Sequence, residues 1–168
     1  MKKLILFIAI FFLTSLEAQN PTFQWAGRFG GTTFGLGRAV TTDASGNVYS
    51  TGMFQATVDF DPGPGVYNLT AAVAGNWEIY ISKLDANGNF LWAKSISCSG
   101  TDEGFGIMSD AIGNVYVSGY FSGIADFDPG PAAYNLQATS FSNDIFILKL
   151  NSSGNFVWAK RIGGTTSD

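Results

Sequence analysis

Apolar and β-branched side chains beyond residue 20 recur at every second position or in short runs, and Gly, Asn or Asp bounds each stretch. This pattern predicts β-strands, because a strand places alternate side chains on opposite faces of a sheet. The first half of the chain gives strands at 39–42, 47–54, 78–84 and 89–96. The second half gives strands at 106–109, 114–121, 144–150 and 155–162.

Short polar turns join these strands in pairs. Each turn starts with Asp or Asn and has Gly at its fourth position, at 43–47, 85–89, 110–114 and 151–155. Glycine in that place adopts the left-handed conformation that closes a tight hairpin. The strands are therefore expected to be antiparallel, and only the connection between the second and third strand of each half is long.

The two halves are copies of one repeat. The segment Asp-Phe-Asp-Pro-Gly-Pro at 59–64 returns at 126–131, an offset of 67 residues. The segment Phe-X-Trp-Ala at 23–26 returns at 90–93 and 156–159, where the second interval is 66 because one residue is missing near Asn143. Copy one spans 23–89, copy two spans 90–155, and a partial third copy occupies 156–168.

Four antiparallel strands per copy predict an all-β fold built from β-propeller blades. The main alternative is a stacked β-solenoid, whose coils are usually shorter and lack repeated hairpins. A closed ring needs about four to eight blades, so two blades predict a truncated propeller. We expect further blades beyond Asp168 in the parent chain, or else self-association, since an isolated pair exposes apolar faces.

Several spaced motifs resemble a known family. These are Gly-Asn-Val-Tyr, Ser/Thr-Gly-X-Phe, Asp-Phe-Asp-Pro-Gly, Asp-Ile-Phe-Ile-X-Lys-Leu and Gly-Asn-Phe-X-Trp-Ala-Lys. Together they are similar to the bacterial SBBP repeat, a seven-bladed β-propeller repeat, over nearly all of 23–168. The resemblance implies export and propeller blades, and it implies no particular activity.

The N-terminus has the pattern of a secretory signal peptide over residues 1–18. Lys2 and Lys3 precede an apolar run from Leu4 to Leu13, and small or neutral residues lead to a cleavage site after Ala18. Ten apolar residues are too few for a membrane-spanning helix, which needs about 20. The sequence therefore predicts a secreted or cell-surface protein without membrane insertion after cleavage.

Charge and composition exclude several functions. The whole chain carries a net charge of −4, and loss of the leader makes it about −5, so a nucleic-acid partner is not expected. The chain has no histidine, which removes the commonest proton carrier and most transition-metal sites. Cys98 is the single cysteine, and we expect a buried apolar residue there, with a free reactive thiol as the alternative.

The Asp-X-Asp-Pro-Gly segments are the candidate metal sites. Alternating carboxylates before a glycine can gather oxygen ligands for Ca²⁺, which needs six to eight of them. The carboxylates in question belong to Asp59, Asp61, Asp126 and Asp128. The alternative is a rigid turn in which these side chains accept backbone N–H bonds, and the short motif favours that alternative.

Trp25, Trp92 and Trp158 occupy the same place in each copy, so we expect them in the core rather than on a carbohydrate-binding platform. Trp77 has no counterpart and is the better candidate for an exposed contact. The sequence thus predicts a non-enzymatic binding or surface-structural module for an unidentified protein or carbohydrate at the cell surface. The alternative is a fragment of a propeller-fold glycan hydrolase, which a unique buried acidic pair would favour.

Overall fold

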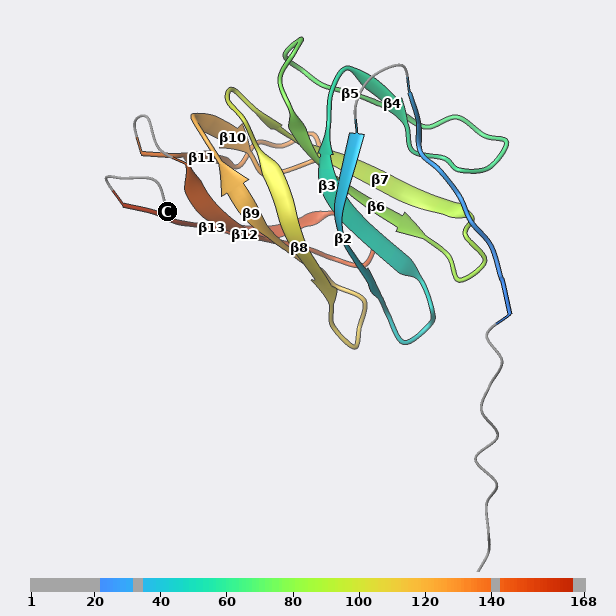
Figure 1. The fold of residues 1–168 in the computed structure, drawn as a ribbon. Coiled ribbons are helices and arrows are strands. Elements are labelled where there is room, and N and C mark those ends of the chain that lie inside the picture. The colour runs from blue at the N-terminus through green and yellow to red at the C-terminus, as the bar shows by residue number, and fades with distance from the viewer. Residues whose placement is uncertain (1–21, 32–34, 140–142, 165–168) are drawn as a thin grey trace, which may run out of the picture.

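A computed structural model describes residues 22–31, 35–139 and 143–164, and in these residues every regular element is a β-strand (Figure 1). The strands form three antiparallel sheets. The described residues contain no helix long and apolar enough to cross a membrane. The predicted leader at 1–18 and the end of the partial third copy, 165–168, lie outside the described residues.

The two large sheets each contain a four-stranded blade, as the hydrophobic pattern predicts. Blade one consists of β2 (Gly35–Thr42), β3 (Val48–Phe54), β6 (Glu78–Leu84) and β7 (Phe90–Cys98). Blade two consists of β8 (Glu103–Ser109), β9 (Val115–Phe121), β12 (Asp144–Leu150) and β13 (Phe156–Ile162). The first strand of each blade begins three or four residues earlier than predicted, in glycine-rich sequence that carries little strand signal.

The predicted hairpin turns are present at all four positions. In the first of them, the Asp43 amide donates to the Asn47 carbonyl at 3.0 Å, and the Asp43 carboxylate accepts the Ser45 and Asn47 amides. Gly46 has φ of 78°, and the equivalent glycines of the other three turns are also left-handed. The Asp or Asn that starts each turn thus folds the loop locally, which explains its recurrence.

The long middle connections contain a feature that the strand pattern does not predict. Each forms a small hairpin, β4 (Thr57–Asp59) with β5 (Asn68–Thr70) in copy one and β10 (Ile124–Asp126) with β11 (Asn135–Gln137) in copy two. The second hairpin pairs with β7 of blade one, where Ala125 faces Cys98. The first pairs in the same register with β1 (Gly30–Gly31), where Val58 faces Gly31.

The small hairpin of blade two therefore extends the sheet of blade one. Strand β1 precedes blade one and pairs with its small hairpin. The end of β7 pairs with the small hairpin of blade two in the same way. The segment before blade one thus takes the place of the last strand of an earlier blade, although residues 22–29 form no strand. Successive repeats are held together by backbone hydrogen bonds as well as by side-chain packing.

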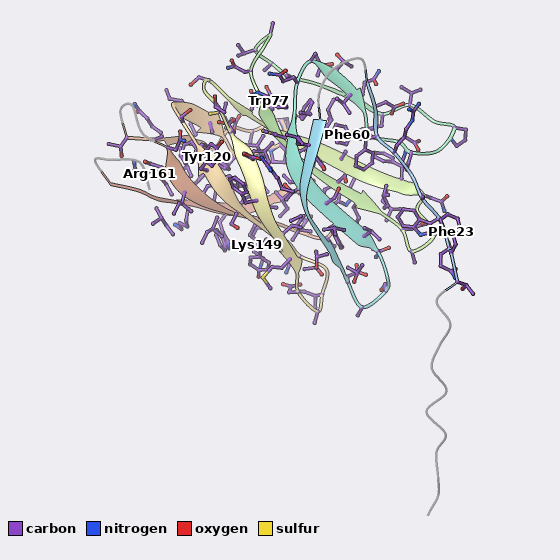
Figure 2. All side chains as sticks on the ribbon, in the orientation of Figure 1. Phe23, Phe60, Trp77, Tyr120, Lys149 and Arg161 are labelled. Atoms are coloured by element: carbon purple, nitrogen blue, oxygen red, sulfur yellow. The ribbon has the colours of Figure 1, made fainter. Side chains whose placement is uncertain are left out.

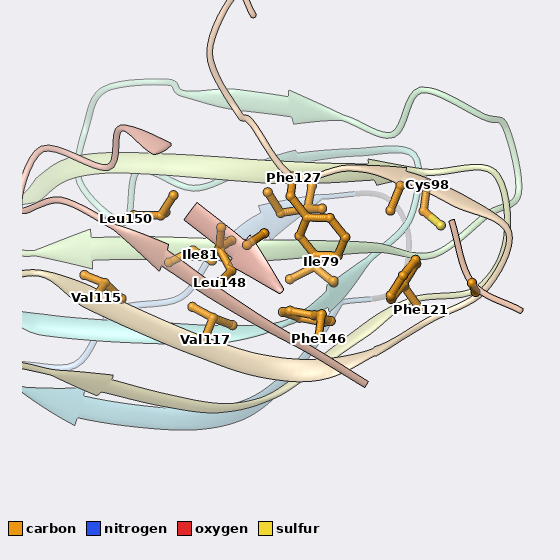
Figure 3. Close-up of a cluster of buried hydrophobic side chains, with 14 of the residues drawn as sticks. Ile79, Ile81, Cys98, Val115, Val117, Phe121, Phe127, Phe146, Leu148 and Leu150 are labelled. Atoms are coloured by element: carbon orange, nitrogen blue, oxygen red, sulfur yellow. The ribbon is translucent and has the colours of Figure 1, made fainter. Parts of the chain in front are cut away.

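The largest hydrophobic cluster lies between the two blades (Figure 3). Blade one contributes one face, which we call its trailing face because the next repeat covers it: Tyr49, Thr51, Ile79, Ile81 and Ile96. Blade two contributes the opposite kind of face, its leading face: Val115, Val117, Phe121, Phe146 and Leu148. Because all ten side chains are at most 1% exposed, their packing is a principal source of stability for the pair.

A second, smaller cluster covers part of the leading face of blade one. Phe54, Phe60 and Tyr80 are buried there with Ala93, and Phe29 from the segment before blade one packs against them. The Phe29 and Phe60 ring centroids are 5.0 Å apart. The N-terminal segment thus shields this face only along one side.

Candidate functional site

The Asp-X-Asp-Pro-Gly loops have the same hydrogen bonds in both copies. Asp59 Oδ1 accepts the amides of Asp61 at 3.0 Å and of Tyr67 at 2.8 Å. Asp61 Oδ1 accepts the amide of Gly63 at 2.8 Å. In copy two the corresponding acceptors are Asp126 and Asp128, with equal distances.

These contacts are those of a rigid turn. One oxygen of each carboxylate already accepts backbone N–H groups, which leaves two free carboxylate oxygens per loop where Ca²⁺ needs six to eight ligands. No group of three or more Asp, Glu, Cys or His side chains gathers around a common point in the described residues. The donor set therefore does not fit a calcium ion, and calcium binding at these loops stays a prediction.

The repeated tryptophans connect one repeat to the next. Trp25 lies flat on Gly88 and its indole N–H donates to the Ala86 carbonyl at 3.0 Å. Trp92 packs in the same way on Gly154 of the following blade, and its indole N–H donates to the Ser152 carbonyl at 3.2 Å. A glycine is needed under each ring because a Cβ there would meet the indole at about 3 Å. Trp25 and Trp92 are half-buried rather than in the core as predicted, and their contacts are structural.

The structure also shows the surroundings of two residues that the sequence analysis singled out, Trp77 and Cys98. Trp77 is half-buried, so only part of its ring is available for a surface contact (Figure 2). Cys98 is buried and its thiol donates to the Ser122 carbonyl. Burial raises the pKa of Cys98 to about 12, which keeps the thiol protonated and confirms the buried, unreactive alternative.

The first strand of each blade carries a β-bulge at the same register. The bulge residue is Arg38 on β2 and Phe105 on β8, where the pairing shifts between the flanking residues. The partner strands place Gly52 and Gly119 opposite, and a Cβ on either glycine would lie 1.9 Å from a carbonyl oxygen of the bulged strand. This explains the glycine of the Ser/Thr-Gly-X-Phe motif, which leaves room for the bulge.

The two bulge residues touch each other across the blades and are surrounded by two further side chains. The Arg38 guanidinium lies 5.5 Å from the centroid of the Phe105 ring and forms an ion pair with Glu103. Phe105 also packs on Tyr120 of β9 at 5.6 Å, and the Tyr120 hydroxyl donates to Glu103 at 3.3 Å. We call these four residues the bulge cluster.

The bulge cluster is accessible. Phe105 is 48% exposed, and the Arg38 side chain is 39% exposed. Its composition is unique in the chain, because the positions of Glu103, Phe105 and Tyr120 are occupied by Leu36, Arg38 and Met53 in copy one. Burial raises the pKa of Tyr120, and the Glu103 carboxylate adds to this effect. The sequence did not single out these residues, although the break in the repeat was a visible signal.

A buried carboxylate lies next to this cluster in sequence. Asp102 has no solvent exposure, and neither of its oxygens has a hydrogen-bond partner among the described residues. The neighbouring Cys98 thiol donates to the Ser122 carbonyl, and its closeness to Asp102 partly lowers the pKa of that carboxyl. Burial, with a smaller contribution from the Glu78 charge, raises the pKa of Asp102 to about 7.

Asp102 and Glu103 do not form a hydrolase site. A glycosidase needs two carboxyl groups that flank a bound sugar, but Asp102 is inaccessible and Glu103 is 4% exposed and paired with Arg38. The described residues therefore give the glycan-hydrolase alternative no support.

Comparison with known proteins gives one informative similarity. No family model matches the chain, so the resemblance to the SBBP repeat stays a prediction. The chain is 31% identical over 163 residues to an uncharacterized WD repeat-containing protein of Acanthamoeba polyphaga mimivirus, covering 80% of this chain. The chain spans 11% of that relative's length. Stacked four-stranded blades and similarity to a WD repeat protein together show that this chain is an all-β repeat protein with a β-propeller-like fold.

Proposed function

We propose that this chain is a non-enzymatic binding or scaffold module that holds a protein partner at the bulge cluster. The observation that carries the proposal is a variable pair of side chains on a constant frame. The glycines that permit the bulge are the same in both blades, whereas the bulge residue changes from Arg38 to Phe105. A constant scaffold with variable exposed residues is the usual arrangement of a recognition surface.

The chemistry of the bulge cluster suits a protein segment. Phe105 offers a half-exposed ring, and the partly exposed Arg38 offers donors that Glu103 does not fully use. Aromatic residues and arginine are the side chains most enriched at protein interfaces. We therefore expect a peptide or loop that places an apolar or aromatic side chain on Phe105 and a carboxylate near Arg38.

The setting of this function rests on the sequence. The predicted leader at 1–18 supports export to the cell surface, and the SBBP-like motifs support the same setting. The acidic net charge disfavours nucleic acid as the partner. A carbohydrate partner is the weaker alternative, because the repeated tryptophans are committed to contacts between repeats.

The test is selection of random peptides displayed on phage against the full chain. Enriched peptides are expected to bind the wild type and to lose at least tenfold in affinity, about 1.4 kcal/mol, with Phe105→Ser or Arg38→Ser. Ile112→Ser is the control, since Ile112 is 79% exposed in a hairpin turn away from the bulge cluster. Failure to enrich any peptide, or peptides that bind all variants equally, would count against the proposal.

A further inference from the structure

We propose that the two end faces of the described chain bind each other head to tail, so that a second copy of this chain docks on the first. The faces are the leading face of blade one and the trailing face of blade two. The trailing face of blade two adjoins the bulge cluster, since Ile145 of that face pairs with Tyr120. The proposal rests on the contact between the two blades, which shows what each kind of face covers.

The trailing faces of the two blades have nearly the same residues. The trailing face of blade one has Tyr49, Ile79, Ile81, Lys83, Trp92 and Ile96. Blade two carries Tyr116, Ile145, Ile147, Lys149, Trp158 and Ile162 at the equivalent positions. Even the cation over the tyrosine ring recurs, with the lysine Nζ 4.9 Å from the centroid in both blades. The trailing face of blade two therefore has the chemistry that packs against a leading face.

The two trailing faces differ in how far their side chains are buried. Ile96 has no solvent exposure where blade two covers it, whereas Ile162 is 52% exposed. Tyr49, Ile79 and Ile81 are likewise fully buried, and their counterparts in blade two are half-buried. An exposed apolar sheet face of this kind marks an interaction surface.

The leading face of blade one has a matching hollow of about 310 Å³. Phe29, Phe54, Phe60, Tyr80 and the backbone of Gly35 to Gly37 line it. The equivalent place on blade two is occupied by blade one: a Cβ on Gly104 would lie 2.4 Å from Thr51 Oγ1 and 3.2 Å from Ile79 Cγ2. Gly104 is the counterpart of Gly37.

This equivalence identifies the residues that enter the hollow. The counterparts of Thr51 and Ile79 are Ser118 and Ile145 on the trailing face of blade two. In a head-to-tail pair, Ile145 and Ser118 of the second copy would lie over Gly37 and against Tyr80 of the first. The pairing needs no new type of contact, because it repeats the one already present between the blades.

One difference makes the new contact weaker than the existing one. Ser50 and Ser82 replace Val117 and Leu148 on the leading face of blade one. Their hydroxyl groups bond each other at 2.7 Å, so they bring no unsatisfied polar group into the contact. They do bury less apolar surface, and we therefore expect reversible association that depends on concentration.

The contact is heterologous, since it joins different faces of the two copies. Such contacts either close into rings or continue as open chains. Each chain offers one leading face and one trailing face. A chain in which one of these faces is disabled can therefore bind only one neighbouring chain.

The test uses two complementary variants of the full chain in sedimentation equilibrium. Val40→Lys disables the leading face, since Val40 pairs with Ser50 of that face, is 68% exposed and is the counterpart of the packed Ile107. Ile147→Lys with Ile162→Lys disables the trailing face. Circular dichroism must show that both variants keep the β-fold, and Ile162→Lys alone, at a residue that is 52% exposed, replaces the pair if the pair does not.

The expected result is an average mass that rises with concentration for the wild type and stays monomeric for each variant alone. An equimolar mixture of the two variants should form a dimer and nothing larger, because it contains one intact leading and one intact trailing face. The control Val66→Lys with Ile112→Lys changes two exposed loop residues and should associate like the wild type.

Three results for the wild type and the face variants would overturn the proposal. They are a wild type that is monomeric at every concentration, variants that associate as strongly as the wild type, or a mixture of the two variants that stays monomeric. Loss of association in the loop control would also overturn it, because the attraction would then be non-specific.

Discussion

The two blades have nearly the same trailing-face residues but different surroundings. Ile81 in blade one and Ile147 in blade two occupy the same strand position, yet Ile81 has no exposure and Ile147 is only half-buried. The residues on this face of the two strands are the same, so local sequence does not set this difference. The burial of a blade residue is decided by the repeat that follows it.

The blades also differ in how they accommodate a buried acid at the start of their third strand. Asp144 in blade two forms an ion pair with Arg161 at 2.7 Å. Its counterpart Glu78 makes no ion pair within the described residues, because Ser95 stands where blade two has Arg161. Burial raises the pKa of Glu78, although the Ala72 amide donates to it. The same buried position thus holds an ion-paired Asp in blade two and a Glu that accepts a backbone amide in blade one.

The largest expected effect comes from truncating the two equivalent isoleucines. Ile81→Ala should lower the free energy of unfolding by about 3 kcal/mol, since it leaves a cavity between the blades. Ile147→Ala should cost about 1 kcal/mol, because its side chain is already partly hydrated. Urea unfolding of both variants measures the difference, and equal losses would show that the next repeat does not control the contribution of this residue.

Asp102→Asn should change the pH dependence of stability. The folded-state pKa of Asp102 is raised to about 7 from an ordinary value of 3.8. Between these values the folded chain holds a proton that the unfolded chain has released, so the wild type loses stability as pH rises through this window. The loss amounts to about 2–4 kcal/mol and is complete above pH 7.

The asparagine variant removes this titration. It should therefore be more stable than the wild type at pH 8 and differ little at pH 4, as measured by urea unfolding at each pH. Asp110→Asn is a control, because Asn114 holds the pKa of Asp110 low and the wild-type group titrates below this window. A parallel pH profile for Asp102→Asn and the wild type would contradict the assignment.

Exchanging Arg161 and Ser95, the equivalent residues near the buried acids Asp144 and Glu78, should change the stability of the two blades in opposite directions. Arg161→Ser gives blade two the arrangement of blade one and should cost about 1–3 kcal/mol at pH 7, because it leaves the Asp144 carboxylate without its cation. Ser95→Arg gives Glu78 a cation and should add about 1 kcal/mol at most. Thermal unfolding compares the two, and a gain from Arg161→Ser would exclude a stabilising role for the pair.

The Asp-X-Asp-Pro-Gly loops should respond equally in the two copies. Asp59→Ala and Asp126→Ala each remove an acceptor of two backbone amides and should cost about 1 kcal/mol.

Calcium and then excess EDTA should leave the melting temperature of the wild type unchanged. A rise of several degrees with calcium, lost in Asp61→Asn with Asp128→Asn, would instead establish metal binding.

The smallest effect concerns one strained turn. Ala56 has φ of 54°, whereas the equivalent residue of copy two is Gly123 with φ of 71°. Ala56→Gly should stabilise the chain by about 0.5 kcal/mol, because it relieves left-handed strain and loses part of that gain to backbone entropy. Gly123→Ala should destabilise it, since the new Cβ would lie 2.4 Å from Ser99 Oγ. Melting temperatures of the two variants test this.

The strands and turns were predictable because their causes are local. Alternating apolar residues, and Asp with a left-handed Gly in each hairpin turn, determine β3, β6, β9 and β12 to within one residue. The small hairpins β4–β5 and β10–β11 were missed, because three-residue strands carry too little pattern and pair with a neighbouring repeat. For Asp59 and Asp126, the sequence favoured a rigid turn in which the carboxylates accept backbone N–H bonds over a metal site, and the structure shows these bonds.

The sequence by itself determined that this chain is a repeat of four-stranded units, since period and turn chemistry are read along the chain. Only the tertiary structure decided which faces are covered, that Arg38 meets Phe105, and that Asp102 is buried without a partner. Each of these facts depends on contacts between residues far apart in sequence. Burial and electrostatics are properties of the neighbours that folding supplies, and identical sequence copies therefore acquire different roles.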